Sequence, residues 1–240
     1  MHVEDFSKLV RSRYSARDFT SDPIPPEVMD GILDDARYCA SWSNTRAYCV
    51  ALAQGEQLER LRHAYTAAFD ESLGLQRKER GAILKALLQG KLPDGDFKVW
   101  REYPKELKPR SQKVGKGLYT AMGVPRGDRV AREAAARRNV QFFGAPAVMW
   151  LFVHKRMLPF SAQDGGILLQ NIMLAAKARG VDSCPLGTLA VWRNPVEKEF
   201  QIPQGYKLIT GLALGYATDA RVNEFRAEHP PIELLPPRAA

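Results

Sequence analysis

The stretch DGGILLQNIMLAAKARGVDSCPLG, Asp164–Gly187, decides the fold of this chain. We expect a helix from Gln163 to Arg179, because Gly180 stands just past its last turn, where glycine commonly ends helices. Apolar residues cover nearly the whole circumference of this helix, and a helix that is apolar on most faces is buried on most faces. The centre of one domain or the interface of a dimer would each provide that burial.

Apolar runs of strand length lie on both sides of this helix. AVMWLFVH (Ala147–His154) precedes it, Leu208–Leu214 follows it, and AYCVALA (Ala47–Ala53) stands earlier in the chain. We predict each as a strand. This order of elements is not a regular βαβ alternation, so it predicts an α+β fold rather than a doubly wound one. Further helices are predicted over Val3–Arg13, from Pro25 and Pro26 to before Ser41, and over Arg129–Phe143.

The middle of the chain, from Gln54 to Arg138, is predicted to be mostly helical and charged. Leu58–Tyr65 marks one helix and Ile83–Leu88 another, whereas Lys91–Arg110 is rich in proline, glycine and lysine. Such an irregular stretch is either a lid or binding loop, or a solvated connector. We interpret residues 1–240 as a single domain with a variable helical and loop region at about 54–128.

The composition is that of a globular protein, with 45% hydrophobic and 26% charged residues. No apolar run approaches the roughly 20 residues of a membrane helix, so no membrane association is expected. The start, MHVEDFSKLV, lacks the apolar region of a secretory signal, and the expected compartment is the cytoplasm. Three cysteines without a CxxC pair support neither a disulfide framework nor a structural zinc site.

The formal net charge of +8 admits two interpretations. One is a surface that binds nucleic acid, and the other is a basic pocket for a phosphorylated small molecule. The basic residues are dispersed and carry no helix-turn-helix, RRM or zinc-finger signature, which disfavours a nucleic-acid partner.

Missing motifs narrow the chemistry further. No GxGxxG follows a predicted strand, and there is no Walker A motif and no GxSxG elbow. The four histidines are scattered and form no HExxH, which disfavours a metal hydrolase and predicts no metal site.

The segment RSRYSARDF, Arg11–Phe19, is the strongest candidate for a binding site. Three arginines and two serines lie within nine residues at the expected end of a helix. Guanidinium groups bind phosphate in bidentate fashion, and serine hydroxyls add short-range donors. A solvated basic helix end is the alternative, since the helix dipole also favours cations there.

Two further segments lie where ligands often bind. ASWSN, ending at Asn44, precedes a predicted strand, and the Asn44 amide offers both a donor and an acceptor. DSCPLG, Asp182–Gly187, follows the long helix, and Gly187 would let the backbone approach a flat ligand closely. Ordinary turns are the alternative for both segments.

Together these segments resemble the nitroreductase family of flavoproteins over most of the chain. RYSARDF is similar to the family's N-terminal phosphate motif, and PIPPEVMDGILDDARYCASWSNTRAY to the helix and loop that follow it. RRNVQFFGAPAVMWLFV, DGGILLQNIMLAAKARGVDSCPLG and YKLITGLALGYATDARVNEFR are similar to its later segments. The resemblance implies an α+β sandwich with a small, mainly antiparallel sheet between helices, and an interlocked homodimer with FMN at the subunit interface.

The resemblance also implies the site residues. Arg13, Tyr14, Ser15 and Arg17 would hold the FMN phosphate, ribityl chain and pyrimidine edge, and Arg226 would add charge at the phosphate. Asn44 would hydrogen-bond near the isoalloxazine N5 and O4. Pro185, Leu186 and Gly187 would lie beside the ring, with a backbone N–H near N5.

The implied reaction is carried by the flavin. NAD(P)H would deliver a hydride to FMN, and a nitroaromatic or quinone acceptor would then take two electrons on the same face, in ping-pong order. No protein nucleophile is required. Dehalogenation, enoyl reduction and flavin fragmentation on the same fold, or flavin binding without turnover, are the alternatives that the sequence leaves open.

Two departures from the family pattern lie in the predicted site. Arg46 stands where the family has an amide, and it would stabilise an anionic reduced flavin, attract an anionic substrate or face solvent. His229 stands where the family has an arginine, so phosphate binding would rest more on Arg226 or depend on pH, as imidazole titrates at about pH 6.5. One of Tyr119, Phe142 and Phe143 would stack on an aromatic acceptor, with ordinary packing as the alternative.

Overall fold

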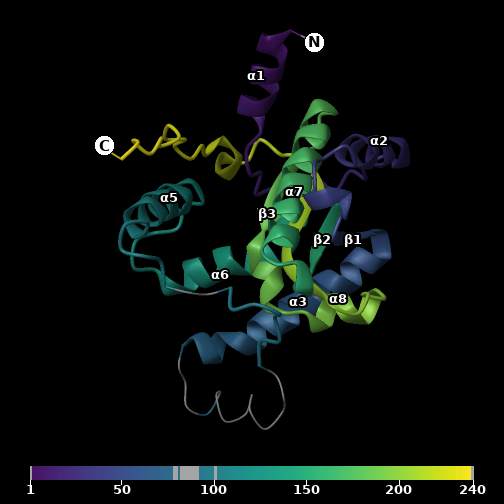
Figure 1. The fold of residues 1–240 in the computed structure, drawn as a ribbon. Coiled ribbons are helices and arrows are strands. Elements are labelled where there is room, and N and C mark those ends of the chain that lie inside the picture. Colours follow the sequence, from purple (N-terminus) through teal and green to yellow (C-terminus); the bar gives the residue numbers. More distant parts are fainter. Residues whose placement is uncertain (1, 78–80, 82–91, 100–101, 239–240) are drawn as a thin grey trace.

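The computed structural model describes residues 2–77, 81, 92–99 and 102–238 of the chain. Its centre is a four-stranded sheet in the order β1-β2-β4-β3, with every neighbouring pair antiparallel (Figure 1). The strands are Tyr48–Gln54 (β1), Ala147–His154 (β2), Asp182–Leu186 (β3) and Tyr206–Gly215 (β4). This arrangement confirms the predicted α+β class with a small antiparallel sheet.

Helices surround the sheet. In chain order, those described are α1 (Val3–Ser12), α2 (Pro26–Ala36), α3 (Gly55–Gln76), α5 (Lys108–Ala121), α6 (Arg129–Val140), α7 (Phe160–Ala178) and α8 (Asn194–Glu199). Short 3₁₀ turns cover Trp42–Asn44 (η1), Phe142–Gly144 (η2), Lys155–Met157 (η3), Gly187–Val191 (η4) and Arg221–Glu224 (η5).

The two faces of the sheet carry separate cores because side chains alternate along a strand. Val148, Trp150 and Phe152 of β2 pack with α3 and α6, whereas Met149 and Leu151 pack with α2 and α7. Burying one such side chain stabilises the fold by about 1.5–3 kcal/mol. The continuous apolar run of β2, predicted as a strand, therefore reflects burial on both faces.

One strand was not predicted, and one predicted helix end was wrong. Asp182–Leu186, interpreted from the sequence as a binding segment with an ordinary turn as the alternative, is an edge strand that pairs with β4 over its whole length. The basic helix α6 ends at Val140, not at Phe143, because Phe142 and Phe143 turn the chain with φ of 58° and 54°. The helix predicted around Ile83–Leu88 lies outside the described residues.

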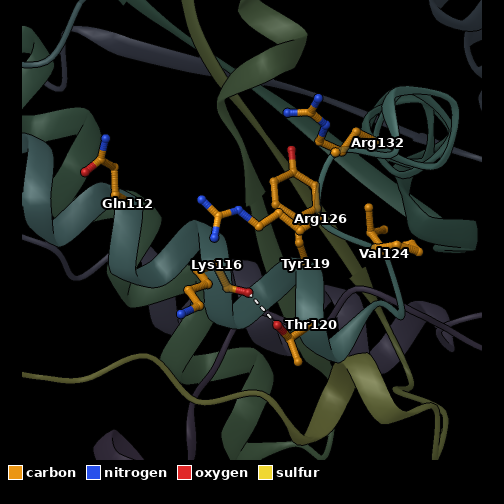
Figure 2. A pocket seen from close by; sticks show the side chains of 9 residues that line it. Gln112, Lys116, Tyr119, Thr120, Val124, Arg126 and Arg132 are labelled. Carbon is orange, nitrogen blue, oxygen red and sulfur yellow. Dashed lines mark hydrogen bonds between the residues drawn. The ribbon is translucent and has the colours of Figure 1, made fainter.

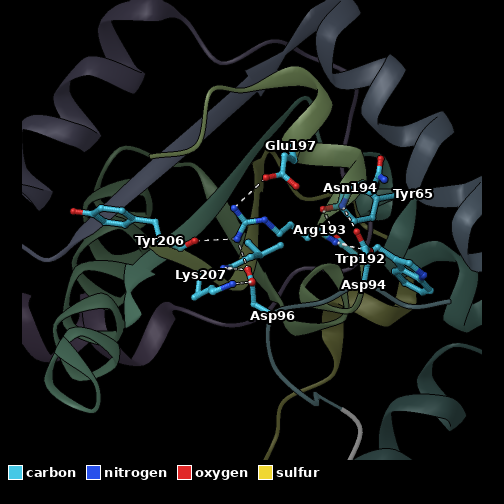
Figure 3. A network of polar contacts seen from close by, with 10 residues as sticks. Tyr65, Asp94, Asp96, Trp192, Arg193, Asn194, Glu197, Tyr206 and Lys207 are labelled. Atoms are coloured by element: carbon cyan, nitrogen blue, oxygen red, sulfur yellow. Dashed lines mark hydrogen bonds and ion pairs between the residues drawn. The ribbon is translucent and has the colours of Figure 1, made fainter. Parts of the chain in front are cut away.

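The described part of the Lys91–Arg110 stretch contains a segment that is tied to the body by two aspartates (Figure 3). The Asp96 carboxylate accepts hydrogen bonds from Arg193 Nη1 at 2.5 Å, Lys207 Nζ at 2.6 Å and the Leu208 N–H at 2.8 Å. The Asp94 carboxylate accepts from the Arg193 and Asn194 N–H groups, where α8 begins. The segment is thus held to α8 and β4 by the buried carboxylate of Asp96 and the exposed carboxylate of Asp94.

Both ends of the chain expose apolar side chains. The helix α1 has no buried residue, and Val3 and Phe6 are exposed on it. Ile232, Leu234 and Leu235 are exposed on the C-terminal segment, which runs away from the sheet (Figure 1). Within the described ranges, no helix combines the length and the apolar character needed to cross a membrane.

Candidate functional site

The arginine segment after α1 docks along the edge strand β3. Ser15 forms a parallel β-bridge with Ser183, and the Ala16 N–H donates to the Ser183 carbonyl at 3.0 Å. This pairing brings Arg13 and Arg17 toward the Cys184 thiol. Burial raises the pKa of Cys184 to about 11, while the charges of Arg17 and Arg13 and a hydrogen bond with Ser15 act in the opposite direction.

The buried Asn223 of η5 fixes the same segment from the C-terminal side. Its Oδ1 accepts from the Arg17 N–H at 2.7 Å, and its Nδ2 donates to the carbonyls of Asp18 at 2.8 Å and Thr218 at 2.9 Å. A buried amide that makes all these bonds holds two distant backbones in one geometry. The orientation of the arginine segment therefore depends on the segment after β4.

Arg226 lies over the ring of Tyr14, with its guanidinium carbon 3.7 Å from the ring centroid. Its Nη1 also donates to the Asn223 carbonyl at 2.6 Å. Lys177 of α7 approaches the same ring, at 5.3 Å. Arg226 and Lys177 thus both lie against the Tyr14 ring, next to Arg13 and Arg17. Burial is the main cause of the raised pKa of Tyr14. His229 is exposed farther along the tail.

The end of β3 offers an open surface next to this cluster. Pro185 and Gly187 are exposed, while Leu186 is buried and anchors the strand in the core. A Cβ placed on Gly187 would meet no atom within 4 Å, so there is free space above this backbone. A flat ring could lie there.

The Asn44 loop has a strained backbone. Ser43, Asn44 and Arg46 have φ of 48°, 53° and 47°, in the left-handed region that residues other than glycine rarely adopt. Such strain persists only where surrounding contacts impose it, and it clusters at functional sites. Asn44 and Arg46 are both exposed, and Arg46 Nε donates to Asn44 Oδ1 at 3.2 Å.

Asp164 of α7 imposes that loop conformation. Its buried carboxylate accepts from the Trp42 N–H through both oxygens, at 3.0 and 3.2 Å. The Trp42 ring also stacks on Phe160, with a centroid distance of 4.1 Å. The start of α7 therefore positions the loop, just as the end of α7 positions Lys177 beside Tyr14.

The predicted site residues fall into two groups on opposite edges of the sheet. The Asn44 loop leads into β1, whereas the arginine segment and Gly187 belong with β3. Three inter-strand spacings of about 4.8 Å separate these edges, or about 14 Å in all. Along α7, Asp164 and Lys177 are about 20 Å apart. One chain brings Arg13, Tyr14, Ser15, Arg17, Arg226 and Pro185–Gly187 together, and it leaves Asn44 and Arg46 elsewhere.

The three aromatic candidates for acceptor stacking have different positions. Phe142 and Phe143 are fully buried in the core. Their rings have no free face for an acceptor, so the expectation that one of them stacks on the substrate is corrected to core packing. Tyr119 of α5 is exposed and lines a cavity between α5 and α6 (Figure 2).

The group of site residues at the β3 edge, which includes the arginine segment and Arg226, fits an anionic, phosphate-bearing ligand. Among the described residues, no carboxylate pairs with the guanidinium of Arg13, Arg17 or Arg226, whereas Lys177, which also approaches Tyr14, pairs with Asp182. The half-buried Arg13 and Arg17 and the exposed Arg226, next to the Ser15 hydroxyl, are a donor set suited to phosphate. The free space at Gly187 suits a flat ring.

Sequence reasoning missed Asn223, Asp164 and Lys177. Only Asp164 carries a signal in the sequence, as an acid near the start of an otherwise apolar helix. Two of the three partners of Asn223, Arg17 and Asp18, lie about two hundred positions away along the chain, so no local pattern could reveal its function.

Comparison with known proteins agrees with this geometry. The model of the Nitroreductase family matches residues 10–216. The chain is 28% identical to 4-nitrobenzoate reductase of Pseudomonas putida over 93% of this chain and 91% of that protein, and 30% identical to chloronitrobenzene nitroreductase of Comamonas testosteroni over 88% and 86%. It is also similar to the crystal structure of the FMN-dependent nitroreductase NfnB from Mycobacterium smegmatis in complex with NADPH, with a TM-score of 0.81 and 28% identity over 95% of each chain. A match across this much of the sequence and the fold shows that the chain belongs to the nitroreductase family.

Proposed function

We propose that this protein binds FMN and uses NAD(P)H to reduce nitroaromatic compounds. The observation that carries the proposal is the cluster of Arg13, Arg17 and Arg226, which has no carboxylate partner in the described chain and lies beside the open end of β3. The relatives named above act on nitrobenzoate and chloronitrobenzene, or depend on FMN, and they support the assignment.

The residues of the chain would bind and orient the cofactor. Arg13, Ser15 and Arg17 would hold the phosphate and polar chain, and Arg226 would add charge while Tyr14 keeps its guanidinium in place. Pro185 and Gly187 would lie against the ring, with a backbone N–H as donor. When bound, FMN supplies two-electron chemistry that accepts a hydride from NAD(P)H and returns electrons to an acceptor.

The complete site would be formed by two copies of the chain. The Asn44 loop and the arginine cluster lie on opposite edges of one sheet, so a loop from a second copy would complete the site. Exposed apolar side chains on α1 and on the C-terminal segment support an interlocked homodimer, since large exposed apolar patches commonly mark protein interfaces. Half-buried Ile167 and Leu174 of α7 would lie in the same interface.

The electron donor and the acceptor would use the same face of the site in turn. This ping-pong order predicts parallel lines in double-reciprocal plots of rate against NAD(P)H at several nitroarene concentrations. Quinones such as menadione would serve as further acceptors. Intersecting lines would contradict the ping-pong order of the two substrates but not the proposed reduction of nitroarenes.

The first test is the visible spectrum of the purified protein, before and after NADH or NADPH is added without oxygen. Flavin absorption that bleaches with either nucleotide and returns with nitrofurazone is the expected result. The double variant Arg13→Gln, Arg17→Gln should purify without flavin. The matched control, Lys155→Gln with Lys198→Gln, removes two exposed charges elsewhere and should keep it.

Other outcomes would overturn the proposal in distinct ways. A protein that takes up no FMN on reconstitution would refute the cofactor assignment. Bound flavin that no nucleotide reduces would indicate flavin binding without turnover, and reduction that serves only iodotyrosine would indicate dehalogenation.

A further inference from the structure

We propose that the cavity between α5 and α6 binds the carboxylate of an aromatic acid, and so selects anionic aromatic acceptors. The cavity has a volume of about 620 Å³ and is lined by Lys116 and Tyr119 of α5, Arg132 of α6 and Val124–Arg126 of the connection (Figure 2). This volume lies within the range of about 300–1,000 Å³ that is usual for small-molecule pockets. The inference rests on the proposed function, because it names a substrate class for that activity.

The charges around this cavity are of one sign. Its lining includes Lys116, Arg126 and Arg132 and no acidic residue. Among the described residues, neither Lys116 nor Arg126 has a side-chain partner, and Arg132 Nε reaches only the Asp128 backbone carbonyl, at 3.3 Å. Three cations that share a cavity without a counter-ion repel one another, and an anion would relieve that repulsion.

The neighbouring arginines on α6 behave differently. Arg129 pairs with Glu133 at 2.9 Å, Arg137 pairs with Asp70 at 2.6 Å, and Arg138 pairs with Asp18. On α6, Arg132 is therefore the arginine that has no acidic partner within the described chain, and it is also the one that lines the cavity. This distribution points to a ligand with negative charge.

The rest of the lining indicates an aromatic ligand. Figure 2 shows the ring of Tyr119 between the side chains of Arg126 and Arg132, with its hydroxyl directed toward Arg132. Val124 and Pro125 add apolar surface. A ring packed on Tyr119 with its carboxylate at the two guanidinium groups would use both parts of the lining, whereas inorganic phosphate would use only the charges.

The cavity lies near the proposed cofactor site. Lys116 and Thr120 also line a second cavity, which extends along α5 to Phe225 and Arg226. The ring of Phe225 packs against α5 at Gly117, where a Cβ would come within 2.7 Å of it. The helix that presents Tyr119 is therefore packed against the segment that carries Arg226 to Tyr14.

The direct test is binding of benzoate, which cannot be reduced, to the FMN-loaded protein by isothermal titration calorimetry. The variants Arg126→Gln and Arg132→Gln should each weaken binding about tenfold, the usual scale for one charge-assisted hydrogen bond. Arg129→Gln, an equal change of charge beside the cavity, should leave binding within twofold. Higher salt should weaken binding to the parent protein, because exposed charges are screened.

Kinetics separate this inference from the proposed function. Arg126→Gln should raise KM for 4-nitrobenzoate about tenfold and leave KM for nitrobenzene unchanged. Reduction of nitrobenzene without any preference for 4-nitrobenzoate, or equal effects of Arg126→Gln on both, would overturn the inference and leave the proposed function intact. A rise in KM for NADPH but not for NADH, with benzoate binding unaltered, would assign the cavity to the nucleotide phosphate and also overturn it. Failure to reduce either nitroarene would instead refute the proposed function.

Discussion

The Asn223 side-chain oxygen accepts a hydrogen bond from the Arg17 backbone N–H at 2.7 Å, across 206 positions of the chain. The same amide donates to the carbonyls of Asp18 and Thr218. Asn223 is only 6% exposed, so these three bonds form away from water and are costly to lose. The phosphate end of the proposed site is thus built by joining the segment after α1 to the segment after β4.

Replacement of Asn223 should therefore affect both stability and cofactor binding. Asn223→Ala leaves the Arg17 N–H and the Thr218 carbonyl without these partners and removes one of two bonds to the Asp18 carbonyl, which should lower the free energy of unfolding by about 2–4 kcal/mol. FMN affinity should fall as well, because Arg17 is no longer oriented. Urea denaturation and quenching of flavin fluorescence measure the two effects. A loss of stability with unchanged FMN affinity would show that the Asn223 hydrogen bonds do not position the arginine segment.

Arg226 should contribute to FMN affinity through a position that Tyr14 fixes. Arg226→Gln should raise the Kd for FMN about tenfold, since one charge-assisted contact is lost. Arg226→Lys keeps the charge but not the planar stack on the Tyr14 ring, so we expect an intermediate Kd. Arg221→Gln, an exposed neighbour in η5, is the control. Equal affinity for Arg226→Gln and the parent protein would remove Arg226 from the site.

Loss of the Asp164 carboxylate should release the Asn44 loop without disturbing the arginine cluster. Asp164→Ala leaves the Trp42 N–H unpaired, and the strained conformation at Ser43 and Asn44 should then relax. We expect turnover with nitrofurazone to fall while FMN stays bound. A red shift of Trp42 fluorescence, obtained by difference from Trp42→Phe, would report the movement. Asp164→Asn, which keeps one acceptor oxygen, should have a smaller effect, and full activity of Asp164→Ala would contradict this function of the loop.

Asp96 should make stability depend on pH in the acid range. Burial favours its neutral form, but hydrogen bonds from Lys207, the Leu208 N–H and Arg193 outweigh burial, and the pKa is held below its ordinary 3.8. A lowered pKa gives stability that is present above pH 3.8 and lost as the pH falls through the lower value of the folded state. Asp96→Asn should cost about 3 kcal/mol at pH 7, because it removes the buried negative charge that pairs with Arg193 and Lys207.

Urea denaturation of both proteins between pH 7 and about pH 3 checks this prediction. The difference in unfolding free energy should shrink toward the acid end, where the parent carboxylate becomes neutral as well. A difference that stays constant with pH would mean that packing, rather than the charge of Asp96, holds the segment to α8 and β4.

Much of this protein is encoded locally. The strands β1, β2 and β4 follow from apolar runs, α7 ends where Gly180 takes a positive φ of 76°, and the arginine segment stands out by composition. The family resemblance rests on the same local motifs, and the family match confirms it. Each of these features depends on residues within a few positions of one another, so a linear sequence displays it directly.

The tertiary structure decided which residues are neighbours in space. Strand order placed the Asn44 loop and Gly187 on opposite edges of the sheet, and a two-residue turn at positive φ sent Phe142 and Phe143 into the core. Asn223 met Arg17, and Lys116, Arg126 and Arg132 met around one cavity. These contacts join residues far apart in the chain, and they form only when packing of both sheet faces offsets the entropy of closing such long loops. No local sequence pattern reports the balance between packing and loop entropy, so these long-range contacts are seen only in the folded chain.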